Sequence, residues 1–188
     1  MTSGLGLLLA PGAGADRDQS TLVAIDLAGS EVGLIVERMD FPYRKAGRRA
    51  PDRAPVLVRA VTEEAAKLAS RVGRVAMGGR SMGGRMCSIA VAEGVHAAGL
   101  ALISYPLHPP GRPDRLRTEH FPALELPCLF VSGTRDSFGT PAELEAATSA
   151  IPGPVTHRWI EGKDHGLRGV DGEVARIVVD WVVGLATT

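Results

Sequence analysis

The stretch Gly78-Gly79-Arg80-Ser81-Met82-Gly83-Gly84 decides how this chain folds. It follows an apolar run that ends at Met77 and precedes a segment with helical spacing, so it predicts a sharp turn between a strand and a helix. A serine on such a turn takes up strained backbone dihedrals, and the residues two before and two after it crowd each other, so both should lack a Cβ atom. Gly79 and Gly83 occupy those positions. The free N–H groups at the start of the helix would face whatever reacts with Ser81.

Phosphate binding is the main alternative for a glycine-rich turn between a strand and a helix. A P-loop requires Lys and then Ser or Thr after its last glycine, whereas Arg85 and Met86 follow Gly84 here. A dinucleotide-binding fingerprint also requires an acidic residue beyond the next strand, which this sequence lacks. The stretch therefore favours a nucleophilic serine, Ser81, over a phosphate cradle.

Composition predicts one globular domain over residues 1–188, because 45% of the residues are hydrophobic. The 21 Lys and Arg residues balance the 21 Asp and Glu residues, which gives no electrostatic case for nucleic acid or membrane binding. The apolar amino end lacks basic residues before it, so we interpret it as a strand and not as a secretion signal. The two cysteines, Cys87 and Cys128, lie in apolar segments without metal-ligand spacing. We expect a cytoplasmic protein with no metal or organic cofactor.

Apolar runs and helical patterns alternate along the chain. The predicted strands cover residues 5–9, 32–37, 74–77, 97–104, 127–132 and 155–160. The predicted helices cover residues 18–28 with Gly29 as the stop, 56–72, 82–94, 141–150 with Thr140 as the N-cap, and 170–185. Such alternation indicates an α/β fold, a mostly parallel sheet with helices on both faces. In sheets of this kind, ligands bind at the carboxyl ends of the strands.

Three residue types that cooperate in nucleophilic catalysis follow three of the predicted strands, in the order Ser81, Asp136 and His165. A serine hydroxyl is a weak nucleophile unless a base takes its proton. His165 is the candidate base, and Asp136 is the candidate for orienting its ring and stabilising the imidazolium. Asp164 is a rival acid, but it adjoins His165 in the sequence and should point elsewhere.

A tetrahedral oxyanion requires two N–H donors, which we assign to Met82, directly after the serine, and to Ala13, in the loop after the first strand. The small residue Gly12 in the same loop would let a substrate approach closely, and Tyr105 is a second candidate for substrate contact. Arg80, with Arg135 and the basic segment 38–53, would select an anionic substrate. The alternative is that these basic side chains form surface ion pairs of little energetic value.

The chain resembles an alpha/beta hydrolase over nearly its whole length. More narrowly, it resembles the small hydrolase-like family that includes testis-expressed protein 30 and the third subunit of the NSL histone acetyltransferase complex, and more distantly the dienelactone-hydrolase-like proteins. The segments that carry this resemblance are PGAGAD (11–16), FPY (41–43), GGRSMGGR (78–85), SYPLHPPG (104–111), GTRDSFGT (133–140) and GKDHGL (162–167). The dienelactone hydrolases have a nucleophilic cysteine where this chain has Ser81.

The resemblance implies a single alpha/beta hydrolase domain that begins at the family's third strand, with a sheet of about six strands. Segment 105–126, where larger relatives insert a lid domain, is too short for one, so we expect no lid and an open, shallow pocket.

The sequence thus predicts a serine hydrolase that cleaves a small ester or thioester through an acyl-enzyme at Ser81. Its partner would be a small-molecule substrate, with neither nucleic acid nor membrane involved. The alternative function is a catalytically idle hydrolase fold that serves as a protein-interaction module. An intact set of Ser81, Asp136 and His165 argues against that alternative, because a scaffold does not need all three side chains.

Overall fold

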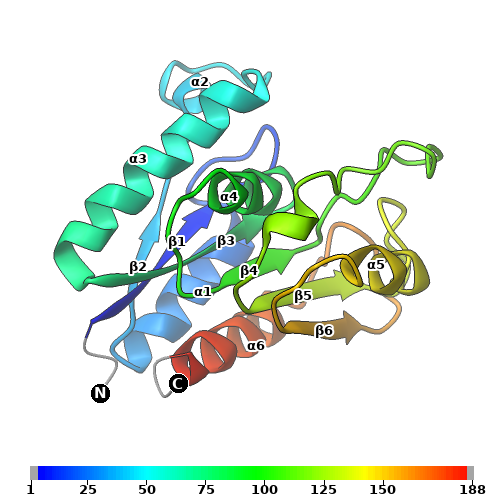
Figure 1. Ribbon diagram of the computed structural model, residues 1–188. Coiled ribbons are helices and arrows are strands. Elements are labelled where there is room, and N and C mark those ends of the chain that lie inside the picture. The colour runs from blue at the N-terminus through cyan, green and yellow to red at the C-terminus, as the bar shows by residue number, and fades with distance from the viewer. Residues whose placement is uncertain (1–3, 186–188) are drawn as a thin grey trace.

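The computed structural model describes residues 4–185 and contains a six-stranded sheet in the order β2-β1-β3-β4-β5-β6, in which every neighbouring pair is parallel (Figure 1). The strands are β1 (Leu5–Ala10), β2 (Ile35–Arg38), β3 (Arg74–Arg80), β4 (Leu100–Ile103), β5 (Cys128–Gly133) and β6 (Val155–Ile160). The helices are α1 (Ser20–Glu31), α2 (Pro42–Lys45), α3 (Ala54–Val72), α4 (Met82–Ala92), α5 (Pro141–Thr148) and α6 (Asp171–Gly184), with a 3-10 turn, η1 (Phe121–Ala123).

Both faces of the sheet are covered, which explains why the four inner strands, β1, β3, β4 and β5, are buried almost without alternation. On β1, Leu7 and Leu9 pack into a core shared with α1 and α6, whereas Leu8 and Ala10 pack into a second core shared with α3 and α4. Figure 1 shows the two pairs of helices on opposite sides of the sheet. The predicted α/β hydrolase architecture, with helices on both faces, is confirmed.

The order in which the chain adds strands to the sheet reverses between β1 and β3. The chain passes from β1 outward to β2, returns to β3 on the other side of β1, and then continues through β4 and β5 to β6. Ligands in open α/β sheets bind at the carboxyl ends of the strands beside such a reversal. The loop after β1 and the turn that contains Ser81 meet at this point, since Ala10 is paired with Gly79.

The glycines around Ser81 are required by a contact different from the one that the sequence suggested. A Cβ atom on Gly79 or on Gly83 would clash with the Ala10 carbonyl oxygen, so the nearest backbone that each glycine crowds is β1 and not the other glycine. Gly84 is the residue that crowds the β3 backbone, because a Cβ there would lie 2.8 Å from the Gly79 carbonyl oxygen. These glycines let the serine turn sit directly against the end of β1.

The first helix and the central strand differ from their predicted limits. Gly29 does not stop α1, which continues to Glu31, and Gly29 is small because a Cβ would lie 2.7 Å from Cγ2 of Val36. The residue that turns the chain out of the helix is Gly33, whose φ is +73°. Strand β3 continues to Arg80, three residues beyond the predicted end, because the β4 backbone offers it hydrogen-bond partners as far as that position.

Two connecting segments expected to be irregular contain short helical turns. Within residues 38–55 the chain forms α2, whose Tyr43 is fully buried. Between β4 and β5, within the described chain, the segment forms the 3-10 turn η1 but no α-helix or strand. It extends away from the sheet as a loop (Figure 1), and the predicted absence of a lid domain is confirmed.

The longest helix, α3, has 19 residues and is amphipathic. Leu57, Val61 and Leu68 are buried on one side, whereas Glu63 and Lys67 are exposed on the other. Across residues 4–185, no helix is both long and apolar enough to cross a lipid bilayer.

The contact at Ala10 predicts opposite effects for two equivalent substitutions, since Gly83 and Gly172 are each the second residue of a helix. Gly83→Ala should destabilise the fold by about 1–3 kcal/mol, because its new methyl group meets the β1 backbone, which cannot move aside. Gly172→Ala should stabilise it by about 0.5 kcal/mol, because its Cβ meets nothing within 4 Å. Urea denaturation of the two variants measures both effects, and equal stabilities would contradict the steric account.

Candidate active site

Ser81 lies at the sharp turn between β3 and α4. Its φ of +49° is rare for a residue with a side chain, as the sequence predicted for a serine on such a turn. A hydrogen bond fixes the turn to β4: the Ser81 N–H donates to the Ile103 carbonyl oxygen at 2.8 Å. Met82 is the first residue of α4, where an N–H group has no acceptor within its own helix.

The three predicted catalytic side chains lie together although they are far apart in the sequence. Nε2 of His165 is 2.9 Å from Oγ of Ser81, and Nδ1 of His165 is 2.8 Å from Oδ2 of Asp136. Asp136 is buried, and a carboxylate can only accept hydrogen bonds, so Nδ1 carries the proton. Nε2 is then unprotonated and can accept the hydroxyl proton of Ser81.

Several groups besides Asp136 hold the His165 ring in place. The Phe138 ring stacks on it, with the two ring centroids 4.0 Å apart and their planes at 29°. The Arg80 guanidinium donates from Nη2 to the His165 carbonyl oxygen at 2.6 Å. Oδ1 of Asp136 accepts the Phe138 N–H at 2.8 Å, so one short segment orients both the carboxylate and the stacked ring.

Asp164, the rival acid, has a local structural role. It is exposed, and its Oδ1 accepts the Gly166 N–H at 2.8 Å, which makes it a turn residue of the loop after β6. The carboxylate that contacts the His165 ring is Asp136.

In the loop after β1, the Ala13 N–H group is available. The Gly12 N–H donates to Oε1 of Gln19 at 3.0 Å, the Gly14 N–H donates to the Tyr43 hydroxyl at 3.1 Å, and the Ala15 N–H donates to the Gly12 carbonyl oxygen at 3.2 Å. The Ala13 N–H has no acceptor among residues 4–185. Ala13 and Met82 both line the cavity described next, as expected for two residues that would bind one oxyanion.

A cavity of about 490 Å³ opens beside Ser81, within the size range of small-molecule sites. Its lining combines the loop after β1, the serine turn, the β4–β5 connection and the two loops that carry Asp136 and His165. The lining residues are Gly12, Ala13, Gln19, Arg80, Ser81, Met82, Arg85, Pro106, Arg117, Phe138 and His165.

Of the three residues predicted to contact substrate, Gly12 and Arg80 line this cavity and Tyr105 does not. Tyr105 is buried in the core, where its ring contacts Phe121 and Phe130. Its hydroxyl donates to the Arg117 carbonyl oxygen at 2.7 Å. The prediction for Tyr105 was wrong because an aromatic residue just after a strand fills the space under the following loop.

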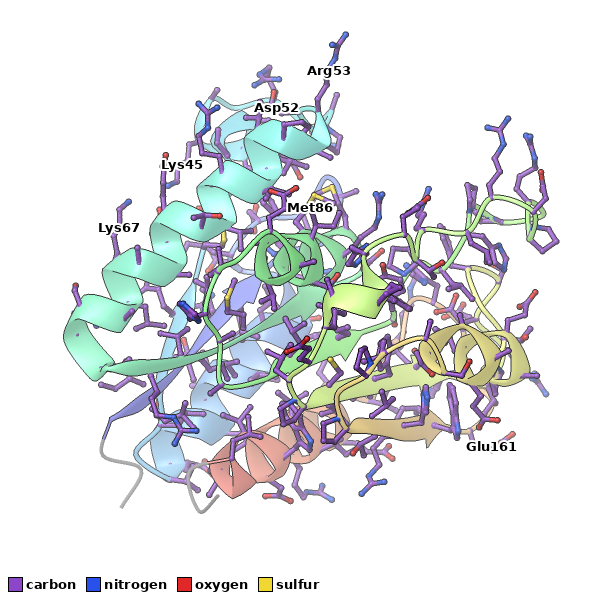
Figure 2. The ribbon with its side chains drawn as sticks, viewed as in Figure 1. Lys45, Asp52, Arg53, Lys67, Met86 and Glu161 are labelled. Atoms are coloured by element: carbon purple, nitrogen blue, oxygen red, sulfur yellow. The ribbon has the colours of Figure 1, made fainter. Side chains whose placement is uncertain are left out.

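The basic segment 38–53 also lies apart from the cavity. Within it, Arg38, Arg44 and Arg48 pair with aspartates at 2.8–2.9 Å, and Figure 2 shows Arg53 projecting away from the sheet. Arg135 lines a different hollow, with Lys163 and Asp164. The alternative of surface ion pairs is therefore correct for most of these side chains.

Sequence reasoning missed Arg85 and Arg117, which line the cavity with Arg80. The position of Arg85 contained a signal, because it lies four residues after Ser81 in a helix that starts at the serine turn. Arg117 had no such signal, since it lies in a long loop whose path depends on tertiary contacts.

Neither cysteine competes with Ser81 as a nucleophile. Cys87 is fully buried, and burial raises the pKa of its thiol to about 12. Its Sγ donates to the Gly78 carbonyl oxygen at 3.2 Å, behind the serine turn. Burial raises the pKa of the Cys128 thiol to about 12 as well.

Comparisons with solved structures agree with the fold. The chain is similar to an alpha-beta serine hydrolase homologue from Coxiella burnetii, at 18% identity and a TM-score of 0.77 over 95% of this chain and 84% of the other. It is similar to dienelactone hydrolase from Anabaena variabilis, at 18% identity and a TM-score of 0.75 over 97% and 86%. It is also similar to Est1E from Butyrivibrio proteoclasticus, at 16% identity and a TM-score of 0.79 over 99% and 90%.

The sequence itself matches one protein family over most of its length. The match covers residues 4–173, which includes all the elements that carry Ser81, Asp136 and His165. The family is described as alpha/beta hydrolase domain, in agreement with the sheet order and with the turn after β3. This chain belongs to the alpha/beta hydrolase domain family.

Proposed function

We propose that this protein is a serine hydrolase that cleaves a small ester or thioester. The observation that carries the proposal is the unbroken series of contacts from the Asp136 carboxylate through His165 to the Ser81 hydroxyl, at 2.8 and 2.9 Å. A nucleophile and a base within hydrogen-bond reach, with the base oriented by a third group, is the arrangement that covalent catalysis requires.

In the proposed reaction, Nε2 of His165 takes the Ser81 proton while Oγ attacks the carbonyl carbon of the substrate. The imidazolium that forms is stabilised by the Asp136 carboxylate on the other side of the ring. His165 then gives its proton to the leaving alcohol or thiol, and an acyl-enzyme remains on Ser81. Water deprotonated by the same His165 hydrolyses the acyl group and restores the serine.

The tetrahedral intermediates carry a negative charge on the former carbonyl oxygen. The N–H groups of Met82 and Ala13 are the proposed donors, since one starts α4 and the other lacks an acceptor within residues 4–185. Losing one such donor typically costs about 3 kcal/mol of transition-state stabilisation. Tyr43 fixes the loop that carries Ala13, because its hydroxyl accepts a hydrogen bond from the adjacent Gly14 N–H.

Other expectations from the sequence stay predictions. They include a small-molecule substrate, one domain over residues 1–188, a cytoplasmic location, and the narrower resemblance to testis-expressed protein 30 and the third NSL subunit. The contrasting function, an idle fold that binds a protein, requires that Ser81 be unreactive.

Reactivity of the serine can be measured directly. Wild-type protein should hydrolyse p-nitrophenyl acetate and be labelled by a fluorophosphonate probe. In Ser81→Ala and His165→Ala, kcat should fall by about 10³-fold or more while the thermal stability is unchanged. The control is Ser70→Ala, which removes an exposed hydroxyl of α3. Equal labelling of wild type and Ser81→Ala, or no labelling of either, would favour the idle fold.

The two neighbouring acids provide a matched pair of substitutions. Asp136→Asn should lower kcat by about 10³-fold to 10⁴-fold, because an amide facing Nδ1 stabilises the tautomer in which Nε2 is protonated and cannot act as a base. Asp164→Asn should leave kcat nearly unchanged, since this carboxylate accepts only a loop N–H. Steady-state hydrolysis of p-nitrophenyl acetate compares the two, and similar losses in both variants would contradict the assignment of Asp136.

A further inference from the structure

We propose that the substrate carries an anionic oxyacid group, a carboxylate or a phosphate, and that Arg85 and Arg117 bind that group. The inference rests on the hydrolase proposed above and adds the chemical class of its substrate. It starts from the charges around the cavity, where Arg80, Arg85 and Arg117 contribute to the lining and no acidic residue of the described chain does.

The three guanidinium groups are at least partly buried, whereas the other arginines of residues 4–185 without an ion pair are exposed. None of the three forms an ion pair with a carboxylate within residues 4–185. Arg38 and Arg44, in contrast, pair with aspartates at 2.9 Å. Partly buried positive charge without a paired carboxylate therefore lies where the proposed nucleophile opens to its substrate.

Arg80 is the most deeply placed of the three, with 6% of its surface exposed. Its Nη2 donates to the His165 carbonyl oxygen, but Nε and Nη1 are buried and have no acceptor in the described part of the chain. Burial lowers the pKa of Arg80. The carboxylates of Asp136, Asp171 and Asp164 act against that lowering, but none of them forms an ion pair with Arg80 within residues 4–185. Buried N–H groups without acceptors are costly, and an anion in the cavity would reduce that cost.

Arg85 is placed where a helix disfavours a cation. It lies in the first turn of α4, its own N–H donates to the Ser81 carbonyl oxygen at 3.1 Å, and its Nε is buried without an acceptor in residues 4–185. The first turn of α4 contains no acidic residue to offset it. The helix terminus and the guanidinium therefore add to one positive field, which stabilises a bound anion.

Arg117 lines the cavity from the β4–β5 connection, where its backbone and side chain are both hydrogen-bonded. Its N–H donates to the Leu107 carbonyl oxygen at 2.9 Å, its Nη1 donates to the Pro106 carbonyl oxygen at 3.4 Å, and its own carbonyl accepts the Tyr105 hydroxyl. Burial lowers the pKa of Arg117, and the charge of Arg85 lowers it further. The β4–β5 loop therefore brings the charge of Arg117 near that of Arg85 on α4, an arrangement that a shared anion stabilises.

Guanidinium groups suit carboxylates and phosphates because their planar N–H donors match the spacing of two oxyacid oxygens. A neutral ester would leave the buried Nε atom of Arg85 without an acceptor. Discrimination against the neutral substrate therefore follows from a polar group that is already desolvated.

The test compares esters that differ only in charge. One pair places the charge on the acyl group, as p-nitrophenyl glutarate against p-nitrophenyl 4-carbamoylbutanoate. The other places it on the leaving group, as 4-acetoxybenzoate against 4-acetoxybenzamide. We expect wild-type protein to favour the anionic member of at least one pair by about tenfold or more in kcat/KM. p-Nitrophenyl 4-phosphonobutanoate distinguishes phosphate-like from carboxylate recognition.

Substitutions assign the preference to residues. Arg85→Gln and Arg117→Gln should each lower the ratio of anionic to neutral kcat/KM, and the double variant should bring that ratio close to one. Arg115→Gln is the matched control, because Arg115 is exposed in the same loop and does not line the cavity. It should keep the wild-type ratio.

The outcomes separate the two proposals. Hydrolysis that depends on Ser81 but shows equal kcat/KM for both members of both pairs overturns this inference and leaves the hydrolase intact. A preference that survives in the double variant also overturns the assignment to Arg85 and Arg117. Absence of any hydrolysis or fluorophosphonate labelling removes the hydrolase, and this inference with it.

Discussion

The structure depends on a close backbone contact at the carbonyl oxygen of Ala10. Two glycines, Gly79 and Gly83, have no room for a side chain beside this oxygen, so the turn that carries Ser81 rests directly on the end of β1. The contact joins β1 and β3, the two strands between which the strand order reverses. It thereby brings the first N–H groups of α4 close to the loop after β1, and we propose that a developing oxyanion binds where the two meet.

The histidine is restrained by contacts that come from separate parts of the chain. Asp136 and Phe138 approach it from the loop after β5, and Arg80 holds its backbone carbonyl from the end of β3. Each contact limits a different motion of the ring, so Nε2 stays within 2.9 Å of Ser81 without further rearrangement. Such preorganisation lowers the cost of reaching the transition state. The same Arg80 links the catalytic geometry to the positive charge of the cavity.

Sequence reasoning predicted the elements whose cause is local. The strand-turn-helix around Ser81 follows from glycine spacing, and Asp136 and His165 follow from the ends of apolar runs. It failed where tertiary contacts decide, as for Gly29, which is small because β2 packs against it and not because the helix stops. Tyr105 was wrongly predicted to contact substrate, and Arg117 was missed, for the same reason. The loop after β4 buries the Tyr105 ring and places the Arg117 guanidinium in the lining of the cavity. No local pattern in segment 105–126 predicts the path of this loop.

The central claim is that Ser81 attacks a carbonyl whose oxygen is received by two backbone N–H groups. A crystal structure of the protein after reaction with a methyl phosphonate ester tests it directly, because the tetrahedral adduct has the shape of the intermediate. The account predicts phosphorus bonded to Oγ of Ser81, with a phosphoryl oxygen about 3 Å from both the Met82 and Ala13 nitrogen atoms. An adduct on another residue, or a phosphoryl oxygen that points away from these two nitrogens, would contradict it.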